Sequence, residues 1–179
     1  MTATYRGILE RTSMEPIISV RNLKKIFTIG DNKVPALNGL DFDIYQGEFI
    51  AIVGTSGSGK STCLNMLAGL EKPSEGKIHI VGEEIEKMNE SELVTFRRNH
   101  VGFIFQSYNL IPFLDAVENV AMPLMFRGVG KEERNKAALH YLELMNIAKE
   151  ANHTPNQMSG GQQQRVGIAR ALVIDPEII

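Results

Sequence analysis

Apolar and polar positions along the chain first predict a series of short strands. Residues 48–53 form a short segment that is apolar and β-branched after Glu48, which predicts a buried strand. Residues 16–23 and 40–44 alternate between apolar and polar positions instead, as strands with one face in a core do. Further strands are predicted at residues 24–29, 34–37, 77–82 and 101–105.

Two helices are predicted among these strands. The stretch from Thr62 to Gly69 is helix-permissive, and Gly69 is placed as a C-terminal stop. Asn89 precedes Glu92 by three positions, which is the spacing of a capping box and predicts a helix through residues 97–98.

Helical spacing dominates after residue 106. Asp115 is predicted to cap a helix that runs to about Met122, where Pro123 and residues 128–130 interrupt it. From Lys131 onward, apolar positions recur at helical spacing. These positions are Ala138, Tyr141, Leu142 and Met145.

The two patterns predict an α/β chain with an N-terminal antiparallel β part and a helical part at about 107–170. Residues 1–15 have no continuous apolar core and are predicted to be a loose N-terminal extension, within which Met14 is an alternative start. Residues 16–179 are predicted to form one domain, which this length allows.

Composition narrows the function classes. The net charge is −2 with no basic block, which argues against nucleic acid as a partner. One cysteine, Cys63, leaves no internal disulfide and is compatible with a reducing compartment. We interpret Cys63 as a small buried residue, with thiol activation by the nearby helix start as a minor alternative. No stretch approaches 18 apolar residues, so no membrane span is predicted.

Residues 54–61 carry the first candidate chemistry. They fit G-x-x-x-x-G-K-[ST], and the predicted strand before them and helix after them are the context that a phosphate-binding loop needs. Glycines let backbone N–H groups approach phosphates closely, and the following helix start adds its positive dipole end. The alternative is a glycine-rich turn beside a lysine. The loop residues are Gly54, Thr55, Ser56, Gly57, Ser58, Gly59, Lys60 and Ser61, followed by Thr62.

This motif assigns roles to two side chains. Lys60 is predicted to reach the β- and γ-phosphates of a nucleotide, and the Ser61 hydroxyl to ligate Mg²⁺. The motif therefore predicts a nucleotide with β- and γ-phosphates, together with Mg²⁺.

A second motif follows at residues 158–162. Ser159 lies before a helical run with Gln162 three positions later, which predicts a second capping box. Gly160 and Gly161 leave this helix start bare of side chains, so an anion could approach its N–H groups. The alternative is a simple capped helix.

Together the two motifs resemble the ATP-binding subunits of ABC transporters. The family signature is L-S-G-G-Q, and here Met158 replaces the leucine. The resemblance runs from about Ile17 to the end. It places Phe27 where the family stacks an aromatic ring on adenine, and Gln106 where the Q-loop glutamine ends its strand. Residues 105–112 and 159–165 are most similar to the lipoprotein-releasing and the macrolide or peptide export branch.

The resemblance implies a fold, a mechanism and partners. The fold is an incomplete P-loop NTPase core of the ABC type with a helical subdomain. ATP is held between the phosphate loop of one subunit and the signature segment, Ser159 to Gln162, of a second subunit in a head-to-tail dimer. Gln106 ligates Mg²⁺ and senses the γ-phosphate. A membrane permease docks near Gln106–Phe113 at the cytoplasmic face of the membrane.

The sequence also departs from the family pattern. After residues 175–179 the family continues with an apolar strand that ends in Asp-Glu, and later with a loop histidine. Neither is present here, because Asp175 is interpreted as a turn residue and Glu177 as a surface residue. We therefore expect a fragment of a longer subunit, truncated before the Walker B strand. We also expect the 179 residues to hydrolyse ATP weakly or not at all.

Three functions remain open from the sequence. The first is an ATPase subunit that drives a membrane exporter. The second is a soluble ABC-type ATPase acting on ribosomes or DNA. The third is a nucleotide-binding interaction module that switches without turnover. The apolar residues 110–113 favour the first and third over the second, since exposed apolar loops mark interfaces, although a local hydrophobic cluster explains them equally well.

Overall fold

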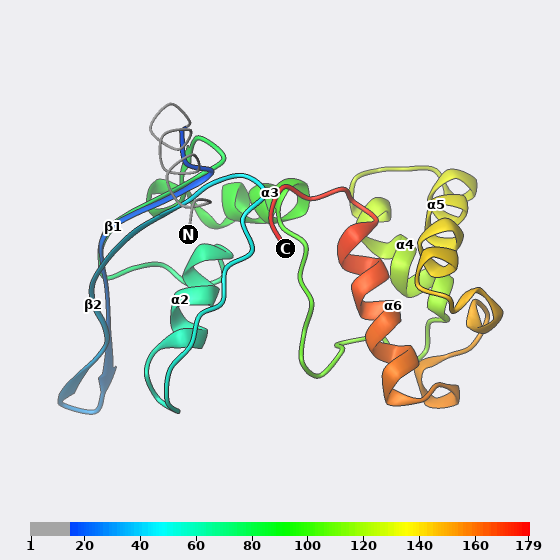
Figure 1. Ribbon diagram of the computed structural model, residues 1–179, viewed down its shortest axis with the longest axis horizontal. Coiled ribbons are helices and arrows are strands. Elements are labelled where there is room, and N and C mark those ends of the chain that lie inside the picture. The colour runs from blue at the N-terminus through cyan, green and yellow to red at the C-terminus, as the bar shows by residue number, and fades with distance from the viewer. Residues whose placement is uncertain (1–14) are drawn as a thin grey trace, which may run out of the picture. The chain divides into compact units, whose positions relative to one another are not determined.

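The computed structural model describes residues 15–179, apart from the side chain of Ile29 (Figure 1). The predicted extension of residues 1–15, with Met14, thus lies outside the described residues except for Glu15. The chain divides into two units, Met1–Leu93 and Val94–Ile179, which we call unit 1 and unit 2. Among residues 15–179, no helix has both the length and the apolar character needed to cross a bilayer.

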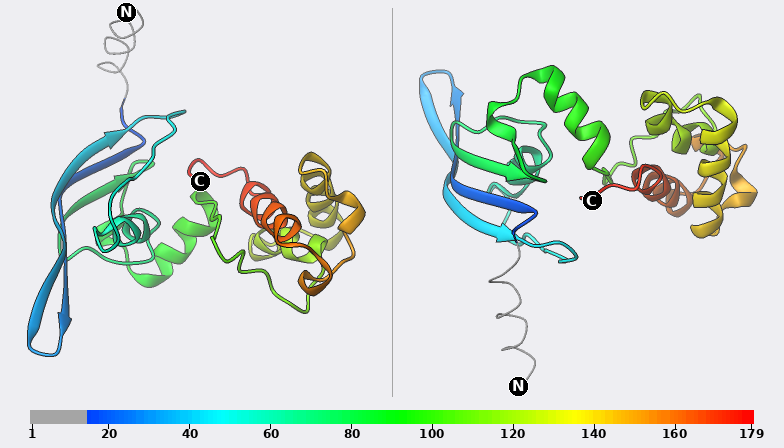
Figure 2. Two further views of the ribbon diagram at one scale, coloured as in Figure 1. Left: turned by 60° about the horizontal axis from the view of Figure 1, so that its bottom comes forward. Right: turned by 90° about the horizontal axis from the view of Figure 1, so that it is seen from above.

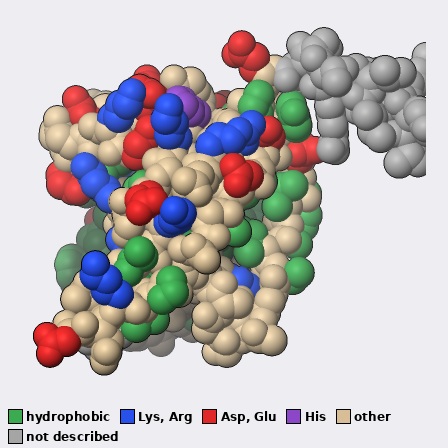
Figure 3. All heavy atoms as spheres, turned by 90° about the vertical axis from the view of Figure 1, so that its left-hand side faces the viewer, with side chains coloured by type: hydrophobic (Ala, Val, Ile, Leu, Met, Phe, Trp, Pro, Cys, Tyr) green, Lys and Arg blue, Asp and Glu red, His purple; other side chains and the backbone are tan. Residues whose placement is uncertain are grey.

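Unit 1 is built on a four-stranded antiparallel sheet with the order β2-β1-β3-β4. The long hairpin visible in Figure 2 pairs Ile18 with Ile44 at one end and Ile29 with Asn32 at the other, so the predicted antiparallel N-terminal part is confirmed. Basic and acidic side chains are interspersed on the face shown in Figure 3. The strands are β1 (Ile18–Ile29), β2 (Asn32–Ile44), β3 (Glu75–Ile80) and β4 (Glu83–Glu84).

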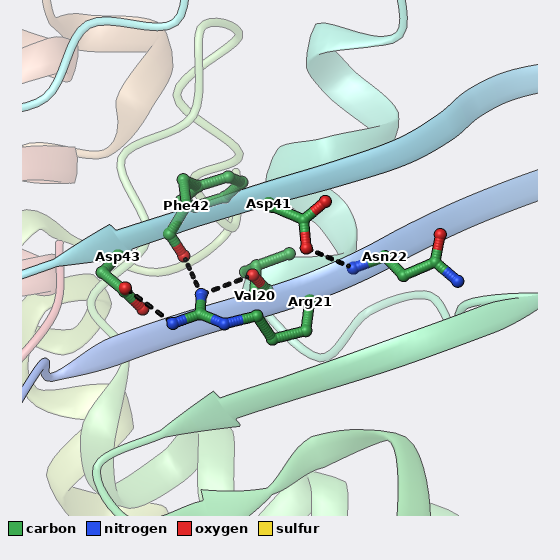
Figure 4. A network of polar contacts seen from close by, with 6 residues as sticks. All are labelled: Val20, Arg21, Asn22, Asp41, Phe42 and Asp43. Atoms are coloured by element: carbon green, nitrogen blue, oxygen red, sulfur yellow. Dashed lines mark hydrogen bonds and ion pairs between the residues drawn. The ribbon is translucent and has the colours of Figure 1, made fainter.

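A polar network fastens β1 to β2 where their register shifts (Figure 4). The Arg21 guanidinium pairs with the Asp43 carboxylate at 2.7 Å and donates to the Phe42 carbonyl at 3.2 Å. Asn22 adopts a left-handed φ of 49°, and its N–H donates to the Asp41 carboxylate. The network therefore supplies hydrogen bonds where the β ladder itself is interrupted.

Both helices predicted among the N-terminal strands are found, with ends that differ by about two residues from the predicted ones. Helix α2 (Lys60–Leu67) is followed by Gly69 with φ 64°, the left-handed residue expected after a helix. Helix α3 (Glu90–His100) spans the boundary between the units. Its predicted capping box is confirmed, because the Asn89 N–H donates to Glu92 at 2.7 Å and the Glu92 N–H donates to Asn89 at 3.0 Å. A short 3-10 turn, η1 (Ile85–Lys87), lies between β4 and α3.

Two predicted buried strands are wrong. Residues 48–53 form no strand, and Phe49 and Val53 are 96% and 85% exposed. In residues 101–105 only Val101 makes a β-bridge, which is parallel and joins it to Ile178. A strand needs neighbours to accept and donate its main-chain hydrogen bonds, and the apolar pattern cannot supply them. Among residues 15–179, neither segment has a ladder of such partners.

Unit 2 is a helical assembly around its own apolar core. Helices α4 (Ala116–Phe126), α5 (Lys131–Leu144) and α6 (Gly160–Leu172) pack against one another, with 3-10 turns η2 (Ala148–Glu150) and η3 (Pro155–Gln157) between α5 and α6. The core side chains include Val120, Ala138, Leu142, Ile147, Val166 and Ala169, all of them buried.

The predicted end of the helix at about Met122 is wrong. Helix α4 continues through Pro123 to Phe126, after the Asp115 cap that the sequence predicted. Proline removes one helical hydrogen bond. Burial of Val120 and Leu124 on either side of Pro123 offsets that loss.

After α6 the chain turns back toward the end of α3. Asp175 has φ 48° and donates its N–H to the Leu172 carbonyl, which confirms the predicted turn. Glu177 was predicted to be a surface residue. It is exposed and lies 3.2 Å from Nδ1 of His100.

Candidate nucleotide-binding site

The phosphate loop, residues 54–61, forms an exposed turn that ends in a helix. Gly57 and Gly59 have φ of 79° and 85°, which only glycine adopts easily. A side chain on Gly59 would also meet the carbonyl of Ala36 on β2, so this glycine is required twice over. No side chain caps the start of α2, and its first N–H groups are therefore open to an anion.

Lys60 folds back over the phosphate loop. Its Nζ donates to the carbonyls of Gly54 at 2.9 Å and Thr55 at 2.7 Å, and it lies 3.4 Å from the hydroxyl of Ser58. A cation held by neutral carbonyls has no charged partner, so a phosphate would be a stronger acceptor for it.

Three consecutive side chains in the first turn of α2 differ in their exposure. Ser61 is exposed and Thr62 is half-buried. Cys63 is buried, and this burial raises the pKa of its thiol. The structure thus confirms Cys63 as a buried residue and contradicts its activation as a nucleophile. Among residues 15–179 no group of three or more His, Cys, Asp or Glu side chains is arranged to hold a metal ion. A cation here would depend on hydroxyls and on the phosphates themselves.

Phe27 lies on β1 in unit 1, half-buried, with the Lys25 ammonium 5.2 Å from the centre of its ring. The other side of an aromatic ring can stack on a flat base. The structure does not test whether Phe27 does so.

The signature segment, residues 158–162, begins α6 with a complete capping box. The Ser159 N–H donates to the Gln162 amide oxygen at 2.8 Å, and the Gln162 N–H donates to the Ser159 hydroxyl oxygen. The Gln162 amide nitrogen donates to Glu150 at 2.9 Å. Both ends of the Gln162 side chain are therefore engaged within the protein, while the hydroxyl proton of the exposed Ser159 can still be donated.

The two glycines of the signature segment have different surroundings. A side chain on Gly160 would lie 2.9 Å from the Tyr108 hydroxyl, whereas one on Gly161 would have only a distant Arg165 atom nearby. The predicted bare helix start is thus found at Gly161, and Gly160 makes room for a tyrosine.

Gln106 is exposed and begins a segment that unit 2 holds firmly. Tyr108 and Asn109, which follow it, both have left-handed φ, 60° and 48°. The Arg170 guanidinium donates to both of their carbonyls, at 2.7 and 2.5 Å. The sequence analysis missed Arg170 and Tyr108, because neither the turn nor its distance from α6 along the chain leaves a pattern.

The apolar loop, residues 110–113, is held by a buried amide. Asn119 is fully buried; its oxygen accepts the Ile111 N–H, and its nitrogen donates to three carbonyls, those of Ile111, Leu114 and Asp115. Leu110 packs on the core of unit 2, whereas Phe113 is 78% exposed. The interpretation as a local hydrophobic cluster is thus confirmed for Leu110, whereas Phe113 is exposed and its role in docking stays a prediction.

Comparison with known proteins identifies the family. The family model described as "ABC transporter" matches residues 37–179. An ABC transporter ATP-binding protein of Thermotoga maritima is 46% identical over 166 residues, which cover 93% of this chain and 71% of the relative. LolD of Chromohalobacter salexigens, a lipoprotein-releasing system ATP-binding protein, is 41% identical, with 92% of this chain and 70% of LolD covered.

Two further comparisons concern a longer relative and a solved structure. MacB of Hahella chejuensis, a macrolide export ATP-binding/permease protein, is 46% identical over 92% of this chain, and the chain spans a quarter of its length. A dimeric, post-hydrolysis structure of the ATP-binding cassette MJ0796 bound to ADP and Pi aligns with a TM-score of 0.83 and 45% identity. That alignment covers 89% of this chain and 70% of the cassette.

Proposed function

We propose, since the chain belongs to the ABC transporter family of ATP-binding proteins, that it binds Mg²⁺–ATP and couples it to export through a membrane permease. The observation that carries the proposal is the phosphate loop with its uncapped helix start. Lys60 leaves the loop carbonyls to bind the β- and γ-phosphates, and Ser61 and Gln106 supply oxygens to Mg²⁺. Phe27 stacks on the adenine.

A second copy completes the nucleotide site. The signature segment offers an anion the Ser159 hydroxyl proton and the open start of α6 at Gly161, which support a role in binding phosphate. The MJ0796 cassette is described as a dimer bound to ADP and Pi. By analogy, the signature segment of one copy binds the ATP held by the phosphate loop of the other, in a head-to-tail arrangement.

The apolar loop is the proposed permease contact. An exposed aromatic ring on a loop fixed by a buried amide is suited to a specific interface, since little order is lost when it binds. The names of MacB and LolD support a partner in the membrane and the export direction. We place the chain at the cytoplasmic face of the membrane on the same ground.

Hydrolysis is the weaker part of the proposed activity for these 179 residues. The phosphate loop and Gln106 provide positioning and charge, but the sequence holds none of the residues to which the resemblance assigns activation of water. We therefore propose tight binding of ATP with slow phosphate release. Phosphate release near that of a version extended by an Asp-Glu strand would contradict this.

The proposal is tested by ATP titration of the chain and two variants. Lys60→Met should weaken ATP about 10- to 100-fold, because a charge-assisted hydrogen bond to phosphate is lost. Lys77→Met, an exposed lysine on β3, is the matched control and should bind ATP as the parent does. Equal affinity of the two variants would show that residues 54–61 are not the phosphate site.

A further inference from the structure

The last turn of α6 carries an arginine that reaches back to the Gln106 segment, which we define as residues 105–110. We propose that Arg170 is a positioning residue that makes the Gln106 segment and the signature helix α6 one mechanical element. The inference rests on the proposed function, in that Gln106 is taken to respond to Mg²⁺–ATP.

The contact is a fork of two hydrogen bonds to adjacent carbonyls. Nη2 of Arg170 donates to the Tyr108 carbonyl at 2.7 Å and Nη1 donates to the Asn109 carbonyl at 2.5 Å. Both residues have left-handed backbone, which is unfavourable for a tyrosine in particular. A planar guanidinium can bridge the two carbonyls at once and so stabilise a turn that this sequence does not favour by itself.

The surroundings of Arg170 indicate that its main role is to bind these two carbonyls. Among residues 15–179 no carboxylate forms an ion pair with it, and burial lowers the pKa of its guanidinium. The ring of Phe105 also lies near it, with its centre 6.0 Å from the guanidinium carbon. Arg170 therefore contacts the Gln106 segment on both sides of Gln106.

The turn also follows α6 toward its start. The Tyr108 carbonyl lies beside Gly167, and the Tyr108 hydroxyl fills the space that a side chain on Gly160 would need. Contacts thus run from the first residue of α6 to its last turn. We therefore expect the Gln106 segment and the helix start that carries Ser159 to move together.

This arrangement gives Arg170 a specific part in ATP binding. We call the two hydrogen bonds from Arg170 to the Tyr108 and Asn109 carbonyls the clamp. They attach the Gln106 segment to α6 two and three residues after Gln106, so the clamp sets how far the Gln106 side chain can reach. Loss of the clamp should therefore remove the benefit of Gln106 while leaving the phosphate loop itself unchanged.

A double-mutant cycle tests the inference. ATP affinity is measured with Mg²⁺ and with EDTA for the parent chain, Gln106→Ala, Arg170→Met and the double variant. The ratio of the two affinities should fall about fivefold in each single variant, and the double variant should fall no further, since both changes remove one contribution. Arg170→Lys, which can reach only one carbonyl, should lie between Arg170→Met and the parent.

Amide hydrogen exchange supplies an independent readout. Exchange at residues 108–110 should be at least tenfold faster in Arg170→Lys and Arg170→Met than in the parent. The matched control is Arg127→Met, which removes an arginine that also donates to backbone carbonyls of unit 2, at Arg98, Asn99 and Ile174. It should lower stability without changing the Mg²⁺ ratio.

Three outcomes would overturn the inference. The first is additive losses in the double variant, and the second is an Mg²⁺ ratio that Arg170→Met leaves unchanged. The third is an equal effect of Arg127→Met, which would make the role of Arg170 one of general stability. The variant Lys60→Met reports on the phosphate loop alone. If it loses ATP affinity as expected while any of these three results is obtained, the inference about Arg170 is wrong and the proposed function stands. No loss of ATP affinity in Lys60→Met would remove both.

Discussion

The two helix starts that carry the candidate site satisfy their free N–H groups in opposite ways. Helix α2 begins at Lys60 with no side-chain cap, and its lysine donates to loop carbonyls and lies near the Ser58 hydroxyl. Helix α6 begins with a complete capping box between Ser159 and Gln162, which Glu150 supports. The first N–H groups of α2 are therefore open to a phosphate, whereas the capping box of α6 already engages the N–H groups of Ser159 and Gln162 and leaves the helix start open only at its glycines.

The same difference extends to the segments around them. In unit 1, the apolar residues 48–53 before the phosphate loop are without a β ladder, and Phe49 is almost fully exposed. In unit 2, Arg170 and Asn119 fix the chain between Gln106 and α4. We therefore expect the surface of unit 2 to be preformed, and the phosphate loop of unit 1 to become more ordered when it binds a phosphate.

The largest expected effect is a loss of folding stability in unit 2. Asn119→Ala should lower the free energy of unfolding by about 3 kcal/mol, because several hydrogen bonds to a buried amide are lost together. Denaturant unfolding measures this, with the exposed Asn152→Ala as control. A loss below about 1 kcal/mol would show that the apolar loop does not depend on Asn119.

The variant Gly59→Ala tests the phosphate loop of unit 1. It should destabilise the chain by about 2 kcal/mol, since alanine opposes the left-handed φ and would also meet the Ala36 carbonyl. Gly57→Ala has the same backbone conformation with nothing nearby, so it should lose only about 1 kcal/mol. If both variants unfold at the same denaturant concentration, the close approach of Gly59 to β2 is unimportant.

The variant Ser159→Ala removes the side-chain cap of α6, so that α6, like α2, begins without one. Ser159→Ala should lower the free energy of unfolding by about 1 kcal/mol, the usual value of an N-cap. ATP affinity of the monomeric chain should not change, because the serine is assigned to the site of a second copy. Thermal unfolding and ATP titration measure the two effects. A large loss of monomer affinity would contradict the head-to-tail arrangement.

The smallest effect concerns the β1–β2 hairpin. A hydrogen bond from Arg21 lowers the pKa of the Asp43 carboxyl, so its contribution to stability is present above about pH 4 and is lost as pH falls through the lowered pKa. Asp43→Asn should therefore be slightly less stable than the parent at pH 7, with the difference vanishing near pH 2. Asp31→Asn, in the exposed hairpin turn, is the control. A constant difference from pH 7 to pH 2 would exclude the ion pair as its cause.

Local signals in the sequence predicted what local contacts determine. The capping boxes at Asn89 and Ser159, the cap at Asp115 and the stop at Gly69 each depend on residues a few positions apart, and each is found. The strand at residues 48–53 failed because main-chain partners cannot be inferred from an apolar run. The helix end at Pro123 failed because core packing overrode a local preference.

In the candidate site, too, residues of contiguous motifs were predicted and residues positioned by contacts outside a motif were not. The phosphate loop and the signature segment are contiguous motifs, so the sequence located both. The contacts of Arg170 with Asn109 and Tyr108 span 61 and 62 positions, and those of Asn119 span 4 to 8. None of them carries a motif, so only the fold brings these residues to their partners. Residues whose function depends on such distant contacts were therefore invisible to the sequence analysis.

The most direct test of the central claim is amide hydrogen exchange of the 179-residue chain, as a dilute monomer, with and without Mg²⁺–ATP. The account predicts that ATP slows exchange at residues 56–62 at least tenfold. Exchange at residues 160–163 should be unchanged, because the capping box is formed within the chain and a monomer has no second copy whose ATP could reach this helix start. Protection of residues 160–163 in the monomer, or none at residues 56–62, would contradict the distinction between a ligand-dependent loop and a preformed signature segment.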